Sequence, residues 1–154
     1  MELIRDGRPS YWAELRAELA AKRARMAEIL ERAQMRPVVP QGGYFMLADF
    51  GPLASHFPEY QTRGEEAGRP NTNDYKFVRW LAREKKLQGI PASAFYSAPN
   101  KPLAQRLVRF CFIKQEATLD RLETLLADLD LDLNPNLNLT AGGGSSSSAR
   151  RAKL

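Results

Sequence analysis

The residue with the clearest chemical potential is Arg109, which lies inside the otherwise apolar run LVRFCFI at 107–113. This run predicts a buried strand, and strand alternation places Arg109 on the face opposite that of Val108, Phe110 and Phe112. A guanidinium stays charged among apolar neighbours, so it needs an anionic partner. No acidic residue lies within three positions. The partner is therefore either a distant side chain in a structural ion pair or a carboxylate supplied from outside, which suits the arginine fork.

Two adjacent glycines, Gly42 and Gly43, precede a second apolar run at 44–50 that also predicts a buried strand. Glycines at such a position allow a positive φ, or a close approach of the backbone to another group. The glycine pair therefore allows either of these before the strand begins.

Other reactive residue types point to little chemistry. The one histidine, His56, falls in a polar loop at 51–73 and is expected to be an ordinary surface residue. The one cysteine, Cys111, excludes a disulfide framework and leaves no cysteine-based metal site. No glycine-rich phosphate loop precedes a helix, which argues against a self-contained phosphate site.

The elements that position these residues are a long helix over about 10–35, capped by Ser10 and ended by Pro37 and Pro40. Further helices are predicted from 73 or 74 to 86 and over 116–130, and a short strand over 87–91, followed by a loop over 92–102. With the strands at 44–50 and 107–113, this order predicts an α/β fold, an α+β sandwich whose small sheet is covered by helices.

Composition narrows the class of protein. A chain of 154 residues suits one domain. The net charge of +5 is spread unevenly: the segment 37–148 is neutral, and the excess lies in residues 1–36 and at the C-terminus. This distribution argues against a nucleic-acid partner. The sequence contains no apolar run long enough to cross a membrane, and its beginning does not read as a secretory signal.

Several stretches resemble one family. The runs NDYKFVRWLAREKKLQGIPASAFYS, VRFCFIKQEATLD and VPQGGYFMLADF are similar to the C-terminal third of kynurenine aminotransferases, which are fold-type I pyridoxal-phosphate enzymes. The resemblance covers about residues 10–130, and its most specific piece is the strand with RFCF. It implies the small-domain fold of these enzymes, with a long linking helix at 1–36 and the small domain at 37–132.

The resemblance also implies roles for individual residues. Arg109 would hold the substrate α-carboxylate, Phe45 would line the substrate pocket in preference to Tyr44, and Gly43 would let the backbone approach the substrate. For Phe45, simple core packing is the alternative.

The rest of the chemistry is expected elsewhere. In such enzymes the Schiff-base lysine, the aspartate at the pyridine nitrogen and the phosphate donors belong to the large domain. None of the seven lysines here has the family's serine-containing context. We therefore expect no catalytic and no cofactor-binding residue in this chain. Pyridoxal 5′-phosphate would act in the complete enzyme, and this chain alone would be inactive.

The implied reaction is transamination from kynurenine or glutamine to a 2-oxo acid, with β-elimination from cysteine conjugates as a second chemistry. The sequence does not decide the amino donor or the oligomeric state, and a homodimer is implied only for the complete enzyme. The implied partners are an amino acid or 2-oxo acid and the missing large domain or a full-length homologue.

The last segment, 133–154, is rich in glycine and serine and is expected to be disordered. It ends in Ala152, Lys153 and Leu154, which resemble a C-terminal peroxisomal address. A peroxisomal location is therefore predicted, with a chance ending and a cytoplasmic location as the alternative.

Three hypotheses remain at this point. The chain is a truncated or split aminotransferase, a non-catalytic module that binds amino acids or a homologue, or a structural protein in which Arg109 pairs internally. An acidic side chain within hydrogen-bonding distance of Arg109 would favour the last.

Overall fold

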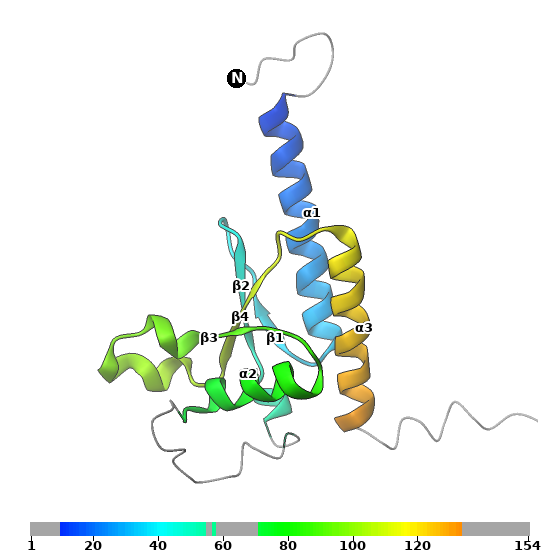
Figure 1. Ribbon diagram of the computed structural model, residues 1–154. Coiled ribbons are helices and arrows are strands. Elements are labelled where there is room, and N and C mark those ends of the chain that lie inside the picture. The colour runs from blue at the N-terminus through cyan, green and yellow to red at the C-terminus, as the bar shows by residue number, and fades with distance from the viewer. Residues whose placement is uncertain (1–9, 55–56, 58–70, 134–154) are drawn as a thin grey trace, which may run out of the picture.

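The structure is a computed structural model that describes residues 10–54, 57 and 71–133, with side chains up to residue 127. Its elements alternate between helices and short strands along the chain (Figure 1). The helices are α1 (Tyr11–Arg32), α2 (Asn73–Glu84) and α3 (Glu116–Leu133). The strands are β1 (Arg36–Val38), β2 (Phe45–Asp49), β3 (Ile90–Pro91) and β4 (Leu107–Cys111). Short 3-10 helices η1 (Gly51–Leu53), η3 (Ala92–Phe95) and η4 (Ala98–Ala104) lie in the described connections.

The strands form one antiparallel sheet in the order β1-β2-β4-β3. Strands β2 and β4 are central, so each is hydrogen-bonded on both sides. Arg109 on β4 stands opposite Leu47 of β2 and opposite Ile90 of β3. Its main chain is therefore fixed from both neighbouring strands.

The two faces of the sheet differ in what covers them. Helices α1 and α3 lie side by side along the sheet, and α2 crosses near its end (Figure 1). On the helix-covered face Met46, Ala48, Val108 and Phe110 are fully or almost fully buried. The alternate positions of β2 and β4 are more exposed, which confirms the alternation predicted for the strand that carries Arg109. The buried cluster also takes residues from all three helices: Met26, Ile29, Leu30, Phe77, Trp80, Leu81, Leu119, Leu122 and Leu126.

An aromatic group ties α2 to the end of β2. The rings of Phe50 and Phe77 stack with centroids 4.1 Å apart, and Phe57 and Trp80 pack around them. Aromatic pairs at such distances add about 0.5–1.5 kcal/mol beyond the area they bury. Helix α2 is thereby held firmly against the sheet.

An ionic cluster on the outer side joins α1 to α3. Arg25 contacts the carboxylates of Glu116, Asp120 and Glu123, and Arg32 reaches Glu123 as well. The hydrogen bonds that Arg25 donates to Asp120 and Glu116 raise the pKa of Arg25 above its ordinary value. Because these groups are largely exposed, the cluster fixes the orientation of the two helices more than it adds stability.

The observed fold confirms the predicted class, a small sheet covered by helices. Ser10 caps α1 as predicted, since its side chain accepts a hydrogen bond from the Ala13 amide. Two details of the prediction were wrong. Pro37, taken only as a helix stop, lies inside the edge strand β1. The strand predicted over 87–91 is reduced to Ile90–Pro91, and the loop after it holds two 3-10 helices.

Some predictions fall outside the described residues, namely His56 and the tail from residue 134, including Ala152, Lys153 and Leu154. Among the described helices, none is long and apolar enough to cross a membrane.

Candidate functional site

Arg109 projects from the sheet face that the helices leave uncovered, and two aromatic rings flank it. Its Cζ atom lies 4.2 Å from the centroid of the Phe45 ring and 4.0 Å from that of the Phe95 ring. Both distances are well inside the range of a cation–π contact. The guanidinium is therefore sandwiched between a ring from β2 and a ring from η3.

The guanidinium lacks an anionic partner among the described residues. Its Nε–H is buried and donates no hydrogen bond within the described part of the chain. Other arginines differ in this respect: Arg106 reaches Asp49 at 3.1 Å, and Arg25 contacts three carboxylates. A cation that is half-buried and unneutralised favours an anion from outside the described structure.

Gly43 begins the strand that supplies Phe45. Its φ is +81°, a conformation that residues with a Cβ adopt only at a cost. This is the positive φ that a glycine pair before a strand allows. A Cβ added at Gly43 would meet nothing within 4 Å, so the conformation and not local crowding requires glycine within the described structure. The neighbouring Tyr44 is exposed, whereas the Phe45 ring contacts Arg109.

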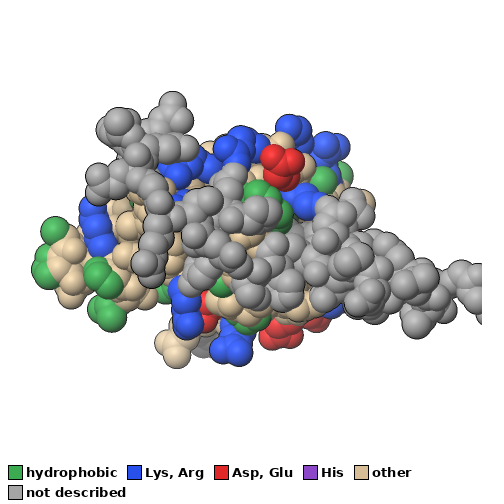
Figure 2. All heavy atoms as spheres, turned by 90° about the horizontal axis from the view of Figure 1, so that it is seen from below, with side chains coloured by type: hydrophobic (Ala, Val, Ile, Leu, Met, Phe, Trp, Pro, Cys, Tyr) green, Lys and Arg blue, Asp and Glu red, His purple; other side chains and the backbone are tan. Residues whose placement is uncertain are grey.

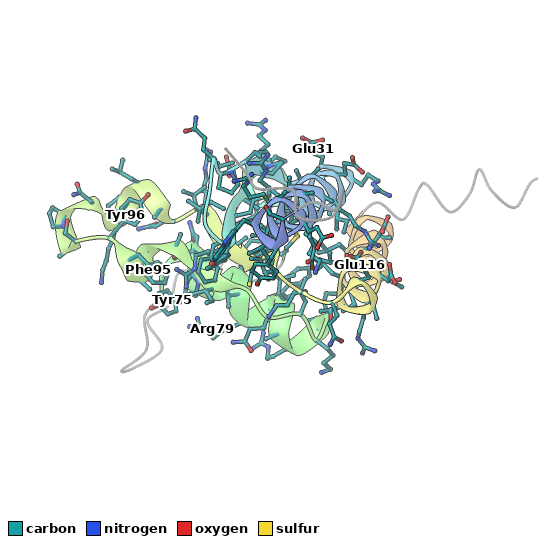
Figure 3. All side chains as sticks on the ribbon, turned by 90° about the horizontal axis from the view of Figure 1, so that it is seen from above. Glu31, Tyr75, Arg79, Phe95, Tyr96 and Glu116 are labelled. Carbon is teal, nitrogen blue, oxygen red and sulfur yellow. The ribbon has the colours of Figure 1, made fainter. Side chains whose placement is uncertain are left out.

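Phe95 is the residue of the site that the sequence did not single out. It lies in η3, immediately after the short strand β3, and its side chain is 58% exposed. Figure 3 shows Phe95 on the side of the molecule where α2 carries Tyr75, far from Glu116 on α3. The segment formed by η3 and η4 projects at one end of the molecule, where hydrophobic side chains are exposed (Figure 2). No residue pattern in the sequence signals that Phe95 meets Arg109, because the pairing depends on β3 lying beside β4.

A buried carboxylate anchors the turn that carries Phe95. Asp74, near the start of α2, is 0% exposed. Its Oδ2 accepts a hydrogen bond from the Ser93 amide at 2.8 Å, and its Oδ1 accepts one from the Thr72 hydroxyl. The position near a helix N-terminus also favours a negative charge. Asp74 therefore links α2 directly to η3.

Two of the described lysines, Lys86 and Lys114, line the same cavity as Arg109. Lys22 pairs with Glu18 on α1, and Lys86 donates to the Arg83 carbonyl. Lys101 and Lys114 are exposed. No loop of glycines precedes a helix N-terminus in the described residues, so these residues present no phosphate-binding loop of that kind. Cys111 is half-buried two positions along β4, and no group of metal-binding side chains occurs among the described residues.

A cavity of about 370 Å³ opens between α3 and residues 86–90, along the edge of β4. Leu119, Leu122 and Phe110 form much of its wall. Arg109 lines it together with Ile90 and Cys111, whereas Phe45 and Phe95 do not. Its other charged lining residues are Lys86, Lys114 and Arg121.

Comparison with known proteins identifies relatives of this chain. No family model matches the chain. Kynurenine–oxoglutarate transaminase 3 of Mus musculus is 40% identical over 120 residues, which is 78% of this chain and 25% of the mouse protein. Kynurenine–oxoglutarate transaminase 1 of Homo sapiens is 32% identical over 117 residues, or 76% of this chain and 26% of that protein. The chain thus spans about a quarter of the length of the curated relatives it matches.

Solved structures give the same result for the fold. The crystal structure of Bna3p from Saccharomyces cerevisiae superposes with a TM-score of 0.68 at 27% identity, over 77% of this chain and 27% of that one. N-succinyldiaminopimelate aminotransferase from Mycobacterium tuberculosis gives a TM-score of 0.59 at 30% identity, over 78% and 27% of the two chains. In each case the match is confined to a small part of the larger protein.

Proposed function

We propose that this chain forms the substrate-carboxylate part of a pyridoxal-phosphate aminotransferase. It is a homologue of the kynurenine–oxoglutarate transaminases over a quarter of their length, and it has the small-domain fold of pyridoxal-phosphate aminotransferases. In this proposal Arg109 binds the α-carboxylate of an amino acid or 2-oxo acid. Phe45 lines the same site, and Gly43 shapes the backbone that enters it.

One observation carries this proposal: Arg109 presents a guanidinium on the uncovered face of the sheet without a carboxylate from the described residues. An internal ion pair, which the structural hypothesis requires, is not found in that part of the chain. An arginine fork binds a carboxylate through two parallel hydrogen bonds. Such a contact fixes the substrate in position and orientation and transfers no proton.

The remaining chemistry would come from sequence outside these 154 residues. Pyridoxal phosphate supplies the electron sink for transamination when it is bound. The described residues present no glycine-rich phosphate loop before a helix, so we assign the cofactor's phosphate donors and its lysine to a large domain elsewhere. The donors we propose are kynurenine or glutamine and the acceptor a 2-oxo acid, with β-elimination as the competing chemistry.

A binding titration of the 154-residue chain tests the carboxylate site. Two-dimensional NMR would follow the protein while L-kynurenine is added, with kynuramine, which lacks the carboxylate, as the matched ligand. We expect weak binding of kynurenine, with a Kd of about 1 mM or above because half the pocket is absent. Kynuramine should bind far less, and Arg109→Gln should abolish the difference. Equal binding of the two ligands would contradict the assignment.

A second candidate function is a non-catalytic module that binds amino acids or a full-length homologue. It is favoured by the fact that the contacts of Arg109 with Phe45 and Phe95 form within the described residues alone. Adding pyridoxal phosphate, kynurenine and a 2-oxo acid to the chain, with and without a lysine-bearing large domain, separates the two. Turnover that needs the large domain favours the enzyme part, and binding without turnover in either mixture favours the module.

We also propose a peroxisomal location from Ala152, Lys153 and Leu154. A fluorescent protein fused ahead of the chain should reach peroxisomes and return to the cytoplasm when these three residues are deleted. Unchanged distribution of the truncated fusion would overturn this proposal.

A further inference from the structure

We infer that Phe95 is a positioning residue: together with Phe45 it clamps the Arg109 guanidinium, and the buried carboxylate of Asp74 sets the clamp in place. This inference rests on the proposed function and extends it to residues that do not touch the substrate carboxylate. It assigns a role to the η3 segment and to the first turn of α2.

The shape of a guanidinium limits the directions in which it can donate hydrogen bonds. The group is planar, its hydrogen-bond donors all point outward within that plane, and its two faces donate nothing. Here the rings of Phe45 and Phe95 lie within 4.2 Å and 4.0 Å of Cζ and occupy the approaches around it. The buried Nε closes the inner side of the group. The outer edge remains as the direction in which Arg109 can donate, and this edge matches the two oxygens of a carboxylate.

Strand pairing and one buried hydrogen bond hold Phe95 beside the Arg109 guanidinium. Strand β3 pairs with β4 at Arg109 itself and at Val108, and η3 follows without a linker. The Ser93 amide, two residues before Phe95, donates to Asp74 at 2.8 Å in a fully buried setting. Charge-assisted bonds of this kind are about twice as strong as neutral ones. The turn is therefore fixed by strand pairing at one end and by Asp74 in its middle.

The exposure of the Phe45 and Phe95 rings distinguishes a clamp from ordinary core packing. Phe45 is 43% exposed and Phe95 is 58% exposed, and neither belongs to the buried cluster. A ring that served only to fill the core would be buried on the helix side, as Phe110 is. The contact that both rings share is the guanidinium. Their arrangement is thus explained by Arg109 and not by the core.

The NMR signal of the Arg109 Nε–H group provides a direct test on the 154-residue chain, identified by its loss in Arg109→Lys. Two flanking rings should shield this signal, and burial should slow its exchange with water. In Phe95→Leu we expect the signal to lose part of that shielding and to exchange faster. The affinity for L-kynurenine should fall about threefold to tenfold, as loss of one cation–π contact implies.

Matched variants make the test specific. Phe95→Tyr keeps the ring and should keep both the signal and the affinity. Leu103→Ala removes an exposed apolar side chain from the neighbouring η4 and should change neither. Asp74→Asn keeps an acceptor of similar shape and should give a smaller change in the same direction as Phe95→Leu.

The outcomes are distinguishable. If kynurenine binds in an Arg109-dependent way and Phe95→Leu changes neither readout, the clamp is refuted while the proposed carboxylate site stands. If the Nε signal responds to Phe95→Leu but neither Phe95→Leu nor Arg109→Gln affects ligand binding, both the positioning role and the proposed function fail.

Discussion

Replacing Arg109 by methionine tests whether this arginine serves a ligand or the fold. Burial of its unpartnered Nε–H lowers the free energy of unfolding by about 1–3 kcal/mol. The two ring contacts return roughly 0.5–1 kcal/mol each at a half-exposed site. Methionine removes the unsatisfied donor, and its sulfur still packs well against aromatic rings. The two effects nearly cancel, so we expect the free energy of unfolding to stay within about 1 kcal/mol of the original value or to rise slightly.

Urea denaturation followed by circular dichroism measures this change. The midpoint should move little and the slope m should be unchanged, since the surface exposed on unfolding is similar. In a thermal scan the midpoint should stay within about 4 °C. The same variant should lose the binding of L-kynurenine. Stability would thus be kept while the proposed function is lost.

The opposite interpretation makes a different prediction. Breaking a buried ion pair by removing one partner costs about 3–5 kcal/mol. A loss of that size in Arg109→Met would show that the arginine is held by an internal anion, and the reasoning about an external carboxylate would be refuted. Arg25→Met is the matched control, because Arg25 contacts three carboxylates between α1 and α3. It should lower the thermal midpoint, less so at high salt, and leave kynurenine binding intact.

Three further substitutions test the supports of the site. Asp74→Ala leaves the buried Ser93 amide without its acceptor and should destabilise the chain by about 1–3 kcal/mol in urea titrations, whereas an unchanged midpoint would mean that the bond is unimportant. Gly43→Ala forces a Cβ onto a φ of +81° and should lower the free energy of unfolding by about 1–2 kcal/mol. Gly42→Ala is the control: its Cβ would meet no atoms within 4 Å, and it should lower the free energy of unfolding clearly less. Gly89→Ala would bring its Cβ to 2.5 Å from Val108 and 3.2 Å from Phe110, so a loss of about 1–3 kcal/mol is expected, and a neutral result would contradict the tight packing seen here.

The strongly patterned elements of this fold were predictable from the sequence. The run at 107–113 alternates so clearly that both its strand conformation and the face of Arg109 follow from side-chain type alone. Helix α1 was predictable because a cap residue precedes a run of helix-forming residues, whereas its end at Arg32 lies before the prolines taken as its stop. Strand β1 was missed because three residues give no period, and because proline is tolerated at the edge of a sheet.

The site was predictable only in part. Arg109 stands out in the sequence because a charge within an apolar run demands a partner. Phe95 does not stand out, because its contact with Arg109 depends on β3 being placed beside β4 and on Asp74 holding the turn from a distance of 19 positions. Contacts between residues so far apart in sequence arise from tertiary structure, and no local pattern of one chain encodes them. The resemblance to aminotransferases pointed to Phe45 and Gly43, but it gave no reason to expect the Arg109 guanidinium between two aromatic rings.

The order of the strands also has a consequence for how the chain folds. Strands β2 and β4 lie side by side in the sheet, yet residues 50–106 separate them along the chain. The central pairing must therefore wait until a long stretch of chain has been closed into a loop, and contacts of this kind slow folding. Loop closure depends only weakly on length: doubling the length adds about 0.6 kcal/mol. The connection after β2 can thus lengthen or shorten between relatives at little cost, while the pairing that brings Phe45 to Arg109 stays the same.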